Sequence, residues 1–493
     1  MNTENPSSTA GCARLAALTL LLALPAVVSA ATDSPEDSPQ ATSTSVYADA
    51  IGSARFERSA IKVEQGHTVE SGNLYTRDGE TGSLVVVRSP DGAVIARIDE
   101  PGKRGLLRVD AQGLASFTPA STNDSRESDA VETQEPMGRD VTISGEHRYI
   151  DLLMAFSDYA LSKMSVDPLA FAFLQVEELN LRLRNSLVTN VSLRLAAVNI
   201  FDVPYDTSIQ GLASWQGLLS PYRSLYKTDL NAAYGGWEGG TAGRGYQPGY
   251  SSVLGWTTSG SDTFGHELAH NAGGKHCWDQ DGRDYNFGHD NGKTKTSLCY
   301  GNRAPYFSNP AVRDAHGLPL GNAQTADMAR VWRENTARLT GYNPELAGLR
   351  MLVVSGNEDQ VATYIRVPGI ERLYRGGVVA LSQSVGPIEL APGTDEKFTM
   401  LNAKLLNAAG SEVLVKLRGT RVEEAQLGWR EHMNSNRYLG LLSSPLGLEI
   451  QYDARDNEAL PVGYYNGLLK LEARRIDSDW TQPINVIVSV RKK

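Results

Sequence analysis

Short runs of alternating apolar and polar residues follow one another between about Ser45 and Pro119. Two of them are residues 83–88 (SLVVVR) and 93–98 (AVIARI), and Asp-Gly and Pro-Gly dipeptides separate such runs. Alternation with period two puts every second side chain on one face of a strand, and these dipeptides favour tight turns. We therefore expect a small β-rich domain. Residues 120–138 then become polar and acidic without apolar periodicity, which indicates an exposed linker that is open to cleavage.

Near Tyr149 the pattern changes from alternation to longer apolar stretches with a helical period. Residues 150–156 and 191–203 predict buried strands, and residues 325–339 predict a closing helix. Between the two strands, apolar residues recur at three- and four-residue steps along one helix face, namely Leu169, Phe173, Val176, Leu179, Leu183 and Leu187. Strands that alternate with helices indicate an α/β domain over about 146–345.

Beyond Asn343 short strands with Gly and Pro turns return. The expected strands are Met351–Ser355, Val378–Ser382, Val413–Leu417, Leu446–Tyr452, Leu468–Ala473 and Ile484–Val490. Their number and spacing predict an antiparallel β-sandwich over residues 346–493. A chain of 493 residues is too long for one ordinary core. We expect a multidomain protein with a β-rich N-terminal region, an α/β middle domain and this C-terminal sandwich.

The first 30 residues have the three parts of a secretory signal peptide. Arg14 precedes the apolar run Leu15–Val28, and residues 28–30 (VSA) form a cleavage site after Ala30. The run is too short for a membrane helix, and a buried N-terminal helix is the alternative. Removal of residues 1–30 leaves residues 31–145 ahead of the middle domain. We expect a secreted protein, extracellular or periplasmic.

The charge balance narrows the classes of partner. The chain has 47 Lys and Arg against 57 Asp and Glu, which gives a net charge of -10, and the basic residues are scattered. Acidic, unclustered charge favours solubility and gives no support for binding nucleic acid or an anionic membrane. We expect neither as a partner, and we expect a monomer.

Residues 266–276 (HELAHNAGGKH) carry the most specific chemistry of the chain. His266 and His270 are four residues apart, so both imidazoles lie on one helix face and can reach one ion. Gly273 lets the chain leave the helix and bring back His276 as a third ligand. Glu267 can hold the metal's water as a general base. Three nitrogens leave one position open, which is the catalytic zinc arrangement.

The alternative for these histidines is a solvated helix face or a core position whose hydrogen bonds are satisfied. Only 8 His occur in the whole chain, and three of them fall within this motif, which argues against chance. His289 and His316 have no usable ligand spacing and are expected to be surface or supporting groups. Residues 279–284 (DQDGRD) are similar to part of a calcium loop but lack its later glutamate, so an ordinary acidic turn is the alternative.

Two cysteines remain after the predicted signal peptide. They are Cys277, directly after the third histidine, and Cys299. In an oxidising compartment they can pair, and such a bridge stabilises by about 3 kcal/mol if unstrained. Two free buried thiols are the alternative. Cys277 is less suited as a metal ligand, because three histidines already complete the pattern.

The motif residues resemble the metzincin zinc endopeptidases, and among them the bacterial adamalysin-like (reprolysin-like) branch. Residues 296–300 (TSLCY) and 304–310 (APYFSNP) are similar to the family's Met-turn and the segment after it. The resemblance covers about residues 146–345 and implies a catalytic domain with a mixed sheet and a zinc helix. Residues 45–119 are more weakly similar to the family's β-rich propeptide. For residues 350–493 the resemblance implies nothing specific.

Two positions depart from the family pattern. Leu298 stands where the turn has its methionine, and Cys277 stands where these enzymes often carry aspartate. Leucine fills a similar apolar volume, since Leu and Met exchange at modest cost in cores. Tyr300 has the spacing of a tyrosine that, in related peptidases, ligates zinc or stabilises the oxyanion; a packed aromatic under the site is the alternative. Residues 31–145 contain no cysteine, so a propeptide thiolate cannot bind the zinc ion and keep the enzyme inactive. Any inhibition by the propeptide needs another ligand or steric cover.

The motif and the resemblance together imply a secreted Zn²⁺-dependent endopeptidase, made as a precursor, that cleaves protein or peptide substrates with Glu267 as general base. Gly-rich residues 239–246 are expected to present an edge strand to an extended substrate. One alternative is a zinc hydrolase of non-peptide amides. Another is an adhesin whose C-terminal sandwich binds a surface ligand, with a degenerate or secondary peptidase domain.

Overall fold

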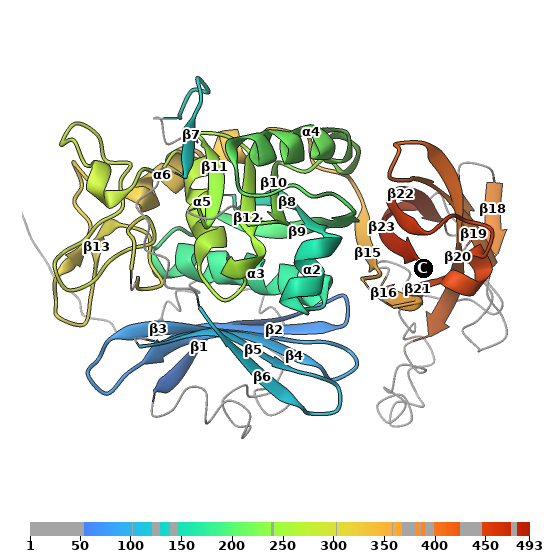
Figure 1. Cartoon of the computed structure of the whole chain (residues 1–493), viewed down its shortest axis with the longest axis horizontal. Coiled ribbons are helices and arrows are strands. Elements are labelled where there is room, and N and C mark those ends of the chain that lie inside the picture. The colour runs from blue at the N-terminus through green and yellow to red at the C-terminus, as the bar shows by residue number, and fades with distance from the viewer. Residues whose placement is uncertain are drawn as a thin grey trace, which may run out of the picture. The chain divides into compact units, whose positions relative to one another are not determined.

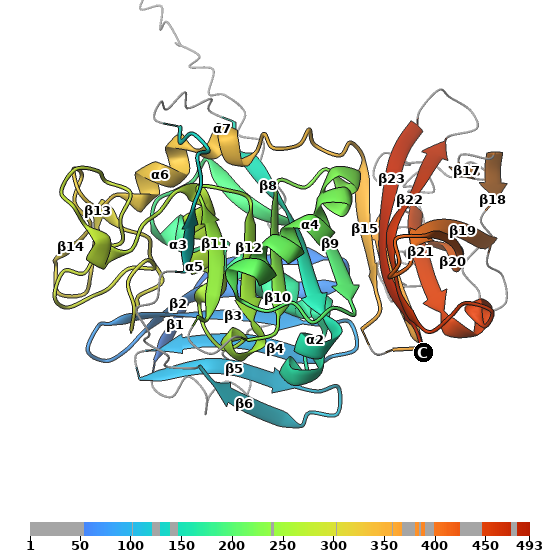
Figure 2. The same cartoon turned by 45° about the horizontal axis from the view of Figure 1, so that its top comes forward.

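The computed structural model is β-rich with few helices (Figures 1 and 2). It describes residues 54–100, 102–120, 129–138, 146–237, 241–301, 303–356, 358–366, 380–383, 386–389, 399–423, 446–474 and 481–493. Across these residues, no helix combines the length and the apolar character that crossing a membrane requires. The predicted signal peptide, residues 1–30, lies outside them.

The first described part of the chain is a six-stranded sheet, here called the N-terminal sheet, in which each strand pairs antiparallel with the next. Its strands are β1 (Arg55–Glu64), β2 (His67–Tyr75), β3 (Thr81–Arg88), β4 (Val94–Glu100), β5 (Lys103–Val109) and β6 (Ala115–Pro119). On β3, Leu84 and Val86 join one apolar cluster, whereas Val85 and Val87 join another. Because side chains alternate between the faces of a strand, the centre of this sheet is buried on both faces.

The second sheet, here called the central sheet, has the strand order β7-β11-β12-β10-β8-β9. Its strands are β7 (Ala130–Glu132), β8 (Arg148–Ser157), β9 (Val191–Phe201), β10 (Leu230–Gly235), β11 (Gly243–Gln247) and β12 (Ser251–Gly255). β8, β9, β10 and β12 are parallel, and β11 is antiparallel to β12. The interior strands β10 and β12 are buried at every position, and β8 from its third residue, because both faces of the sheet are covered.

Three of the described α-helices connect strands of the central sheet, and the other three follow its last strand. The helices are α2 (Asp158–Met164), α3 (Pro168–Asn185), α4 (Ile209–Tyr226), α5 (Thr263–Ala272), α6 (Met328–Glu334) and α7 (Thr336–Leu339), with 3₁₀ turns η2 (Trp256–Thr258), η3 (Cys277–Asp279) and η5 (Ala454–Asn457). The chain passes from β8 through α3 to β9, then back through α4 to β10. Right-handed crossovers in opposite directions put α3 and α4 on opposite faces, as Figure 1 shows.

Local sequence explains where these helices begin. The Ser157, Asp167 and Ser208 side chains accept hydrogen bonds from the first turns of α2, α3 and α4. The closing helix expected over residues 325–339 is in fact α6 and α7, with a break at Asn335, whose amide bonds to the Val331 carbonyl. Between α5 and α6 the chain forms only the short strands β13 (Asn309–Arg313) and β14 (Pro319–Leu320).

Residues 129–138, here called the cover segment, differ from the exposed linker expected over residues 120–138. Asp129 is only 5% exposed, and β7 pairs in parallel with β11 from Ala130 to Glu132. The expectation of an element-free linker is wrong for this described part. These polar residues are held by backbone hydrogen bonds to β11, a strand far along the chain. Backbone bonds do not require apolar side chains, so the sequence shows no apolar periodicity here.

The last part of the chain is a nine-stranded sheet, here called the C-terminal sheet, with its own apolar core. Its strands are β15 (Leu349–Val354), β16 (Gln360–Arg366), β17 (Ala380–Gln383), β18 (Gly386–Glu389), β19 (Thr399–Leu406), β20 (Glu412–Glu423), β21 (Leu446–Asp453), β22 (Gly463–Arg474) and β23 (Thr481–Lys492). The edge strands β15 and β16 contact each other, so the sheet is nearly closed.

The antiparallel sandwich expected over residues 346–493 is wrong in one pairing, because β15 runs parallel to β23. These are the first and last strands of the sheet, so no hairpin turn fixes their relative direction. The strand expected over residues 378–382 is present from Ala380, and its first two positions lie outside the described residues.

Candidate metal centre

Helix α5 places two of the predicted ligands, and every residue of this helix is buried. It ends at Gly273, whose φ of +111° is a conformation that side chains rarely adopt. A Cβ on Gly273 would also lie 2.6 Å from the sulfur of Met137 in the cover segment. After this glycine the chain turns back and brings His276 to the same side as His266 and His270.

The three predicted ligand histidines converge on one point. The Nε2 atom of His276 lies 3.1 Å from the Nε2 atoms of both His266 and His270. Their exposed fractions are 2% for His266, 0% for His270 and 3% for His276. Three nitrogens bound to one tetrahedral zinc ion at 2.0–2.1 Å would be separated by about 3.3 Å, so the spacing fits the metal that the motif implies.

The other ring nitrogens of these histidines have oxygen partners. Nδ1 of His266 lies 2.8 Å from the Ser297 carbonyl oxygen, and Nδ1 of His270 lies 2.8 Å from the Gly274 carbonyl oxygen. Nδ1 of His276 lies 3.3 Å from a carboxylate oxygen of Asp279. Each Nδ1–H therefore donates outward, which leaves the Nε2 lone pair directed at the shared point. Burial lowers the pKa of His266 to about 4, so this imidazole is neutral, as a ligand must be.

Asp129 completes a four-residue cluster from outside the motif. Its carboxylate oxygens lie 2.8 Å from Nε2 of His276, 3.2 Å from Nε2 of His270 and 3.4 Å from Nε2 of His266. A buried carboxylate and three nitrogen lone pairs that face one point call for a cation between them. The cluster can hold a metal ion.

Glu267 lies beside this cluster with an unusual lack of partners. It is fully buried, and neither carboxylate oxygen has a hydrogen-bond partner among the residues that the structure describes. Burial raises its pKa well above the usual range, and the charge of Asp129 raises it further. An unpaired buried carboxylate is costly, so its retention indicates a ligand or reaction that uses it.

Strand β11, which lies between β12 and the outermost strand β7, passes directly over Glu267. A Cβ on Gly243 would lie 2.7 Å from Oε1 of Glu267, and a Cβ on Gly245 would lie 2.9 Å from its backbone oxygen. The Gly-rich residues 239–246 were expected to form an edge strand here, and β11 covers Gly243–Gln247, whereas residues 238–240 lie outside the described chain. Its outer edge carries β7 of the cover segment.

Tyr300 lies at the centre as well. Its hydroxyl donates to a carboxylate oxygen of Asp129 over 2.9 Å, and its ring lies 5.8 Å from the ring of His266 and 4.3 Å from that of Trp278. Burial raises the pKa of Tyr300, and Asp129 raises it further, so the hydroxyl keeps its proton. The tyrosine is thus both packed against the histidines and bonded to the carboxylate that faces them.

The turn below the histidines is joined covalently to the motif. Cys277 and Cys299 form a disulfide, and the Cys277 N–H donates to the Leu298 carbonyl over 3.0 Å. Leu298 is 1% exposed, and a Cβ on Gly274 would lie 2.4 Å from its side chain. Leu298 therefore packs tightly under the loop that carries His276.

The remaining candidate residues lie elsewhere. His289 and His316 are not part of the cluster, which is the one group of potential metal ligands found among the described residues. In residues 279–284, Asp279 contacts His276, while Asp281 and Asp284 accept backbone N–H groups of the same loop. This is the acidic turn given above as the alternative to a calcium loop.

Sequence reasoning missed Asp129 and Arg303. Asp129 stands in a polar stretch with no motif around it. Arg303 bonds to Asp262, at the start of α5, and to the Cys299 carbonyl, and its Nη1 atom lies 3.0 Å from Nδ1 of His266. No local spacing relates either residue to the histidines.

Comparison with known proteins adds little to this geometry. No protein-family model matches the chain, and no curated protein sequence matches it. A structure titled "Structure of a chaperone-substrate complex" aligns at 16% identity and a TM-score of 0.37, over 56% of this chain and 46% of that one, so the chain spans less than half of it. Metalloproteinase-II from Bacteroides fragilis aligns at 11% identity and a TM-score of 0.33, over 51% of this chain and 82% of that one. These TM-scores are too low to assign a function.

Proposed function

We propose that the protein is a secreted Zn²⁺-dependent endopeptidase of the metzincin type, made as a latent precursor. The observation that carries the proposal is the convergence of three outward-bonded histidines beside a buried, unpartnered Glu267. Secretion is supported by the signal-like residues 1–30 and by the disulfide, because disulfides persist in oxidising compartments.

His266, His270 and His276 would hold the zinc ion. When bound, zinc polarises a peptide carbonyl and makes its water acidic enough to attack near neutral pH. Burial and Asp129 raise the pKa of Glu267, whereas the charge of a bound zinc ion would lower it and keep the carboxylate ionised. Glu267 would then accept the proton of that water and deliver it to the leaving amine, so no acyl-enzyme would form. The Tyr300 hydroxyl stays protonated and donates to Asp129; with that partner gone, it is placed to donate to the oxygen of the attacked carbonyl.

The edge of β11 supports a peptide rather than a compact amide as substrate. Gly243 and Gly245 carry no side chain towards Glu267, so an extended chain can pass close to the base. β7 already uses this edge through backbone pairing, which an extended substrate can reproduce once the cover segment is gone. This favours peptide hydrolysis over a zinc hydrolase of small amides.

Asp129 supports synthesis as a precursor. Its carboxylate lies within 3.4 Å of all three Nε2 atoms, where the reacting water and carbonyl need room. The sequence has no propeptide cysteine for this role, and Asp129 is a different ligand in the same place. The cover segment therefore blocks both the metal's free position and the substrate edge.

The test compares two neighbouring substitutions in the purified chain after removal of the cover segment. Glu267→Ala should keep about one zinc per chain and lose peptidase activity by at least about 10³-fold, because the proton acceptor is gone. His266→Ala should lose both the zinc and the activity. Zinc is measured by elemental analysis and cleavage with a peptide library; full cleavage by either variant would overturn the proposal.

A further inference from the structure

The N-terminal sheet and the cover segment, expected from sequence to form one propeptide, contact the rest of the chain in different ways. The first contact is with α3. Residues 168–183 of this helix are buried without exception, although they include Glu177, Glu178 and Arg182. An amphipathic surface helix exposes one face, so the charged face of α3 is covered. Strands β2, β3 and β4 provide that cover.

Apolar side chains of the N-terminal sheet belong to the same core as the central sheet. They are Val69, Val85, Val87, Ile95 and Leu106, each 5% exposed or less. On the α3 side, the ring of Phe173 lies 5.3 Å from that of His67. This face is an interior face, and separation of the sheet would expose it to water.

Charged groups cross the same contact in the interior. Arg97 lies 3.7 Å from Glu178 and donates to the Ser259 carbonyl over 2.7 Å, directly before α5. Asp99 lies 3.8 Å from Arg182, which in turn pairs with Asp262 over 3.0 Å at the start of α5. These charges are buried, so each needs its partner in place.

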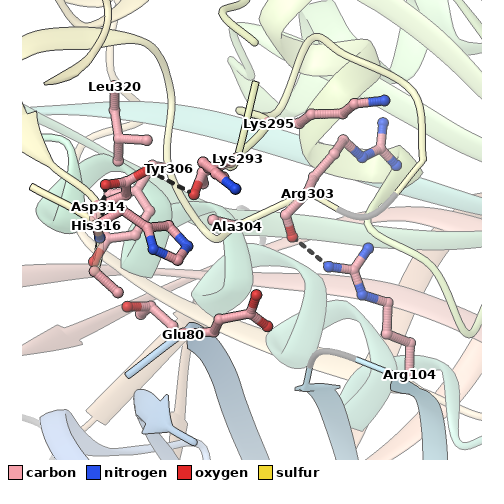
Figure 3. A pocket seen from close by; sticks show the side chains of 13 residues that line it. Glu80, Arg104, Lys293, Lys295, Arg303, Ala304, Tyr306, Asp314, His316 and Leu320 are labelled. Atoms are coloured by element: carbon pink, nitrogen blue, oxygen red, sulfur yellow. Dashed lines mark hydrogen bonds between the residues drawn. The ribbon is translucent and has the colours of Figure 1, made fainter. Parts of the chain in front are cut away.

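A third connection reaches the turn below the histidines. Arg104 of β5 pairs with Asp99 over 2.6 Å. It also donates to the backbone carbonyl of Arg303, as Figure 3 shows. Arg303 in turn pairs with Asp262. Residues of the N-terminal sheet therefore support both the start of the zinc helix and the turn that carries Tyr300.

Polar side chains complete the interface at its edge. Asn73 and Asn185 exchange two amide hydrogen bonds, of 3.1 and 2.8 Å. Ser71 donates to Glu177 over 2.6 Å and accepts from Arg184 over 2.9 Å. The Ser71 hydroxyl thus takes its two partners from α3, whereas Glu177 also pairs with Arg184 of its own helix over 2.7 Å.

The cover segment has a shallower contact. Its pairing with β11 extends over three residues, and the side chain of Glu132 is 75% exposed. Thr133 donates to the Pro248 carbonyl, and the Gly138 N–H donates to Asn335. Asp129 is its deepest side chain and lies against the histidines.

We propose that the N-terminal sheet, residues 54–120, is a lasting structural subunit of this peptidase, and that latency resides in the cover segment alone. The statement about latency rests on the proposed function, whereas the statement about the N-terminal sheet does not. Activation then consists of peptide-bond hydrolysis by another endopeptidase: one water is consumed per cut, and a new carboxylate and a new amine form. The N-terminal sheet stays bound through its buried face, whereas the cover segment departs.

The test uses the full chain with Glu267→Ala, which prevents self-digestion, and a site-specific protease sequence inserted within residues 121–128. After the cut, size exclusion with light scattering should show one species with the mass of the uncut chain. Two species under native conditions would overturn the proposal. Because this readout needs no activity, it is independent of the proposed function.

A pair of variants tests whether the buried charged contacts, rather than nonspecific association, hold the N-terminal sheet on the rest of the chain. Arg97→Met removes a charge that is 2% exposed, whereas Arg55→Met removes one on the same sheet whose side chain is 67% exposed. In the cut chain, the first should raise the rate of exchange with labelled N-terminal fragment at least tenfold, and the second should leave it unchanged. Equal rates for the two variants would contradict retention by the buried network.

The latency half is tested with Glu267 intact. The cut within residues 121–128 should leave the chain inactive, and Asp129→Ala should give activity while the N-terminal fragment still co-elutes. Activity that appears only after the N-terminal sheet separates would overturn the inference. A chain that is inactive in every form while its fragments co-elute would count against the peptidase and would support retention of the sheet.

Discussion

The two halves of the metal centre are built differently. One half is α5 with its return loop, in which three histidines and Glu267 lie within residues 266–276. The other half, here called the cover half, combines the cover segment with the turn below the histidines, so that Asp129 and Tyr300, 171 residues apart, meet at 2.9 Å. The first half is determined by helix geometry and one glycine, whereas the second depends on the completed fold.

The two halves therefore have different proposed roles: the first carries out the reaction, and the second regulates access to it. The helix half contains the proposed ligands and the proposed base, and every residue of α5 is buried. In our proposal, Asp129 and the rest of the cover segment determine whether water and substrate reach them. Substitutions in the first half should therefore abolish function, and substitutions in the second should change its level.

The largest effect is expected from a ligand in the helix half. His270→Ala leaves two nitrogens, too few for a stable catalytic zinc site, so zinc content should fall below a tenth of one equivalent and activity by at least about 10³-fold. The matched control is His289→Ala, because His289 is outside the cluster. Equal zinc loss in both variants would show that the ligand set is wrong.

The next effect belongs to the cover half and has the opposite sign. Asp129→Ala should raise the peptidase activity of the uncut chain by roughly 10²-fold, since charged contacts of this kind contribute about 1.5–3 kcal/mol each. Glu132→Ala, in the same strand but with a side chain that is 75% exposed, should change nothing. The measurement is peptide cleavage by the uncut proteins. If Asp129→Ala cleaves no faster than the unsubstituted chain, the Asp129 carboxylate does not cause latency.

Gly243→Ala tests the surface where the two halves meet. The added Cβ would lie 2.7 Å from Oε1 of Glu267 and must displace the base, so kcat should fall by about 10²-fold while zinc stays bound. Gly217→Ala is the control, because nothing lies within 4 Å of a Cβ at that helix position. Wild-type kcat in Gly243→Ala would show that the strand does not confine Glu267.

How much was predictable follows the same division. Residues 266–276 contain the ligand spacing and the helix-ending glycine, so the gathering of His266, His270 and His276 could be anticipated from sequence. Tyr300 and the Cys277–Cys299 bond were anticipated only as one of two alternatives. The position of Asp129 beside the histidines could not be predicted, because it depends on the parallel pairing of β7 with β11. That pairing leaves no local pattern in the sequence.

The same reason explains the errors in the sheets. Alternation predicts strands within the N-terminal and C-terminal regions, but it does not specify pairing direction between strands far apart in sequence. β15 and β23 pair in parallel for that reason. The sequence predicted one apolar face for α3, but the fold also buries Glu178 and Arg182, because it brings Arg97 and Asp99 to them.

The disulfide is expected to contribute to stability more than to chemistry. The double variant Cys277→Ser, Cys299→Ser should lower the free energy of unfolding by about 3 kcal/mol, the entropy of closing a loop of this size, and leave zinc bound. Urea unfolding of the zinc-loaded chain measures the change. An unchanged midpoint would mean that hydrogen bonds such as Cys277 N–H to Leu298 already fix the turn.

The smallest effect is expected at Leu298, where this chain departs from the family it resembles. Leu298→Met conserves volume, so the free energy of unfolding should change by less than about 1.5 kcal/mol. Activity should stay within about twofold, because Leu298 contributes shape rather than a ligand. The side chain is 1% exposed and lies against Gly274 in the ligand loop, so any misfit would reach His276 first. Zinc content, unfolding midpoint and peptide cleavage are measured on the same variant. Loss of zinc with an unchanged midpoint would show that zinc binding requires leucine at this position. The turn that carries Leu298 would then act in metal binding rather than in covering the site.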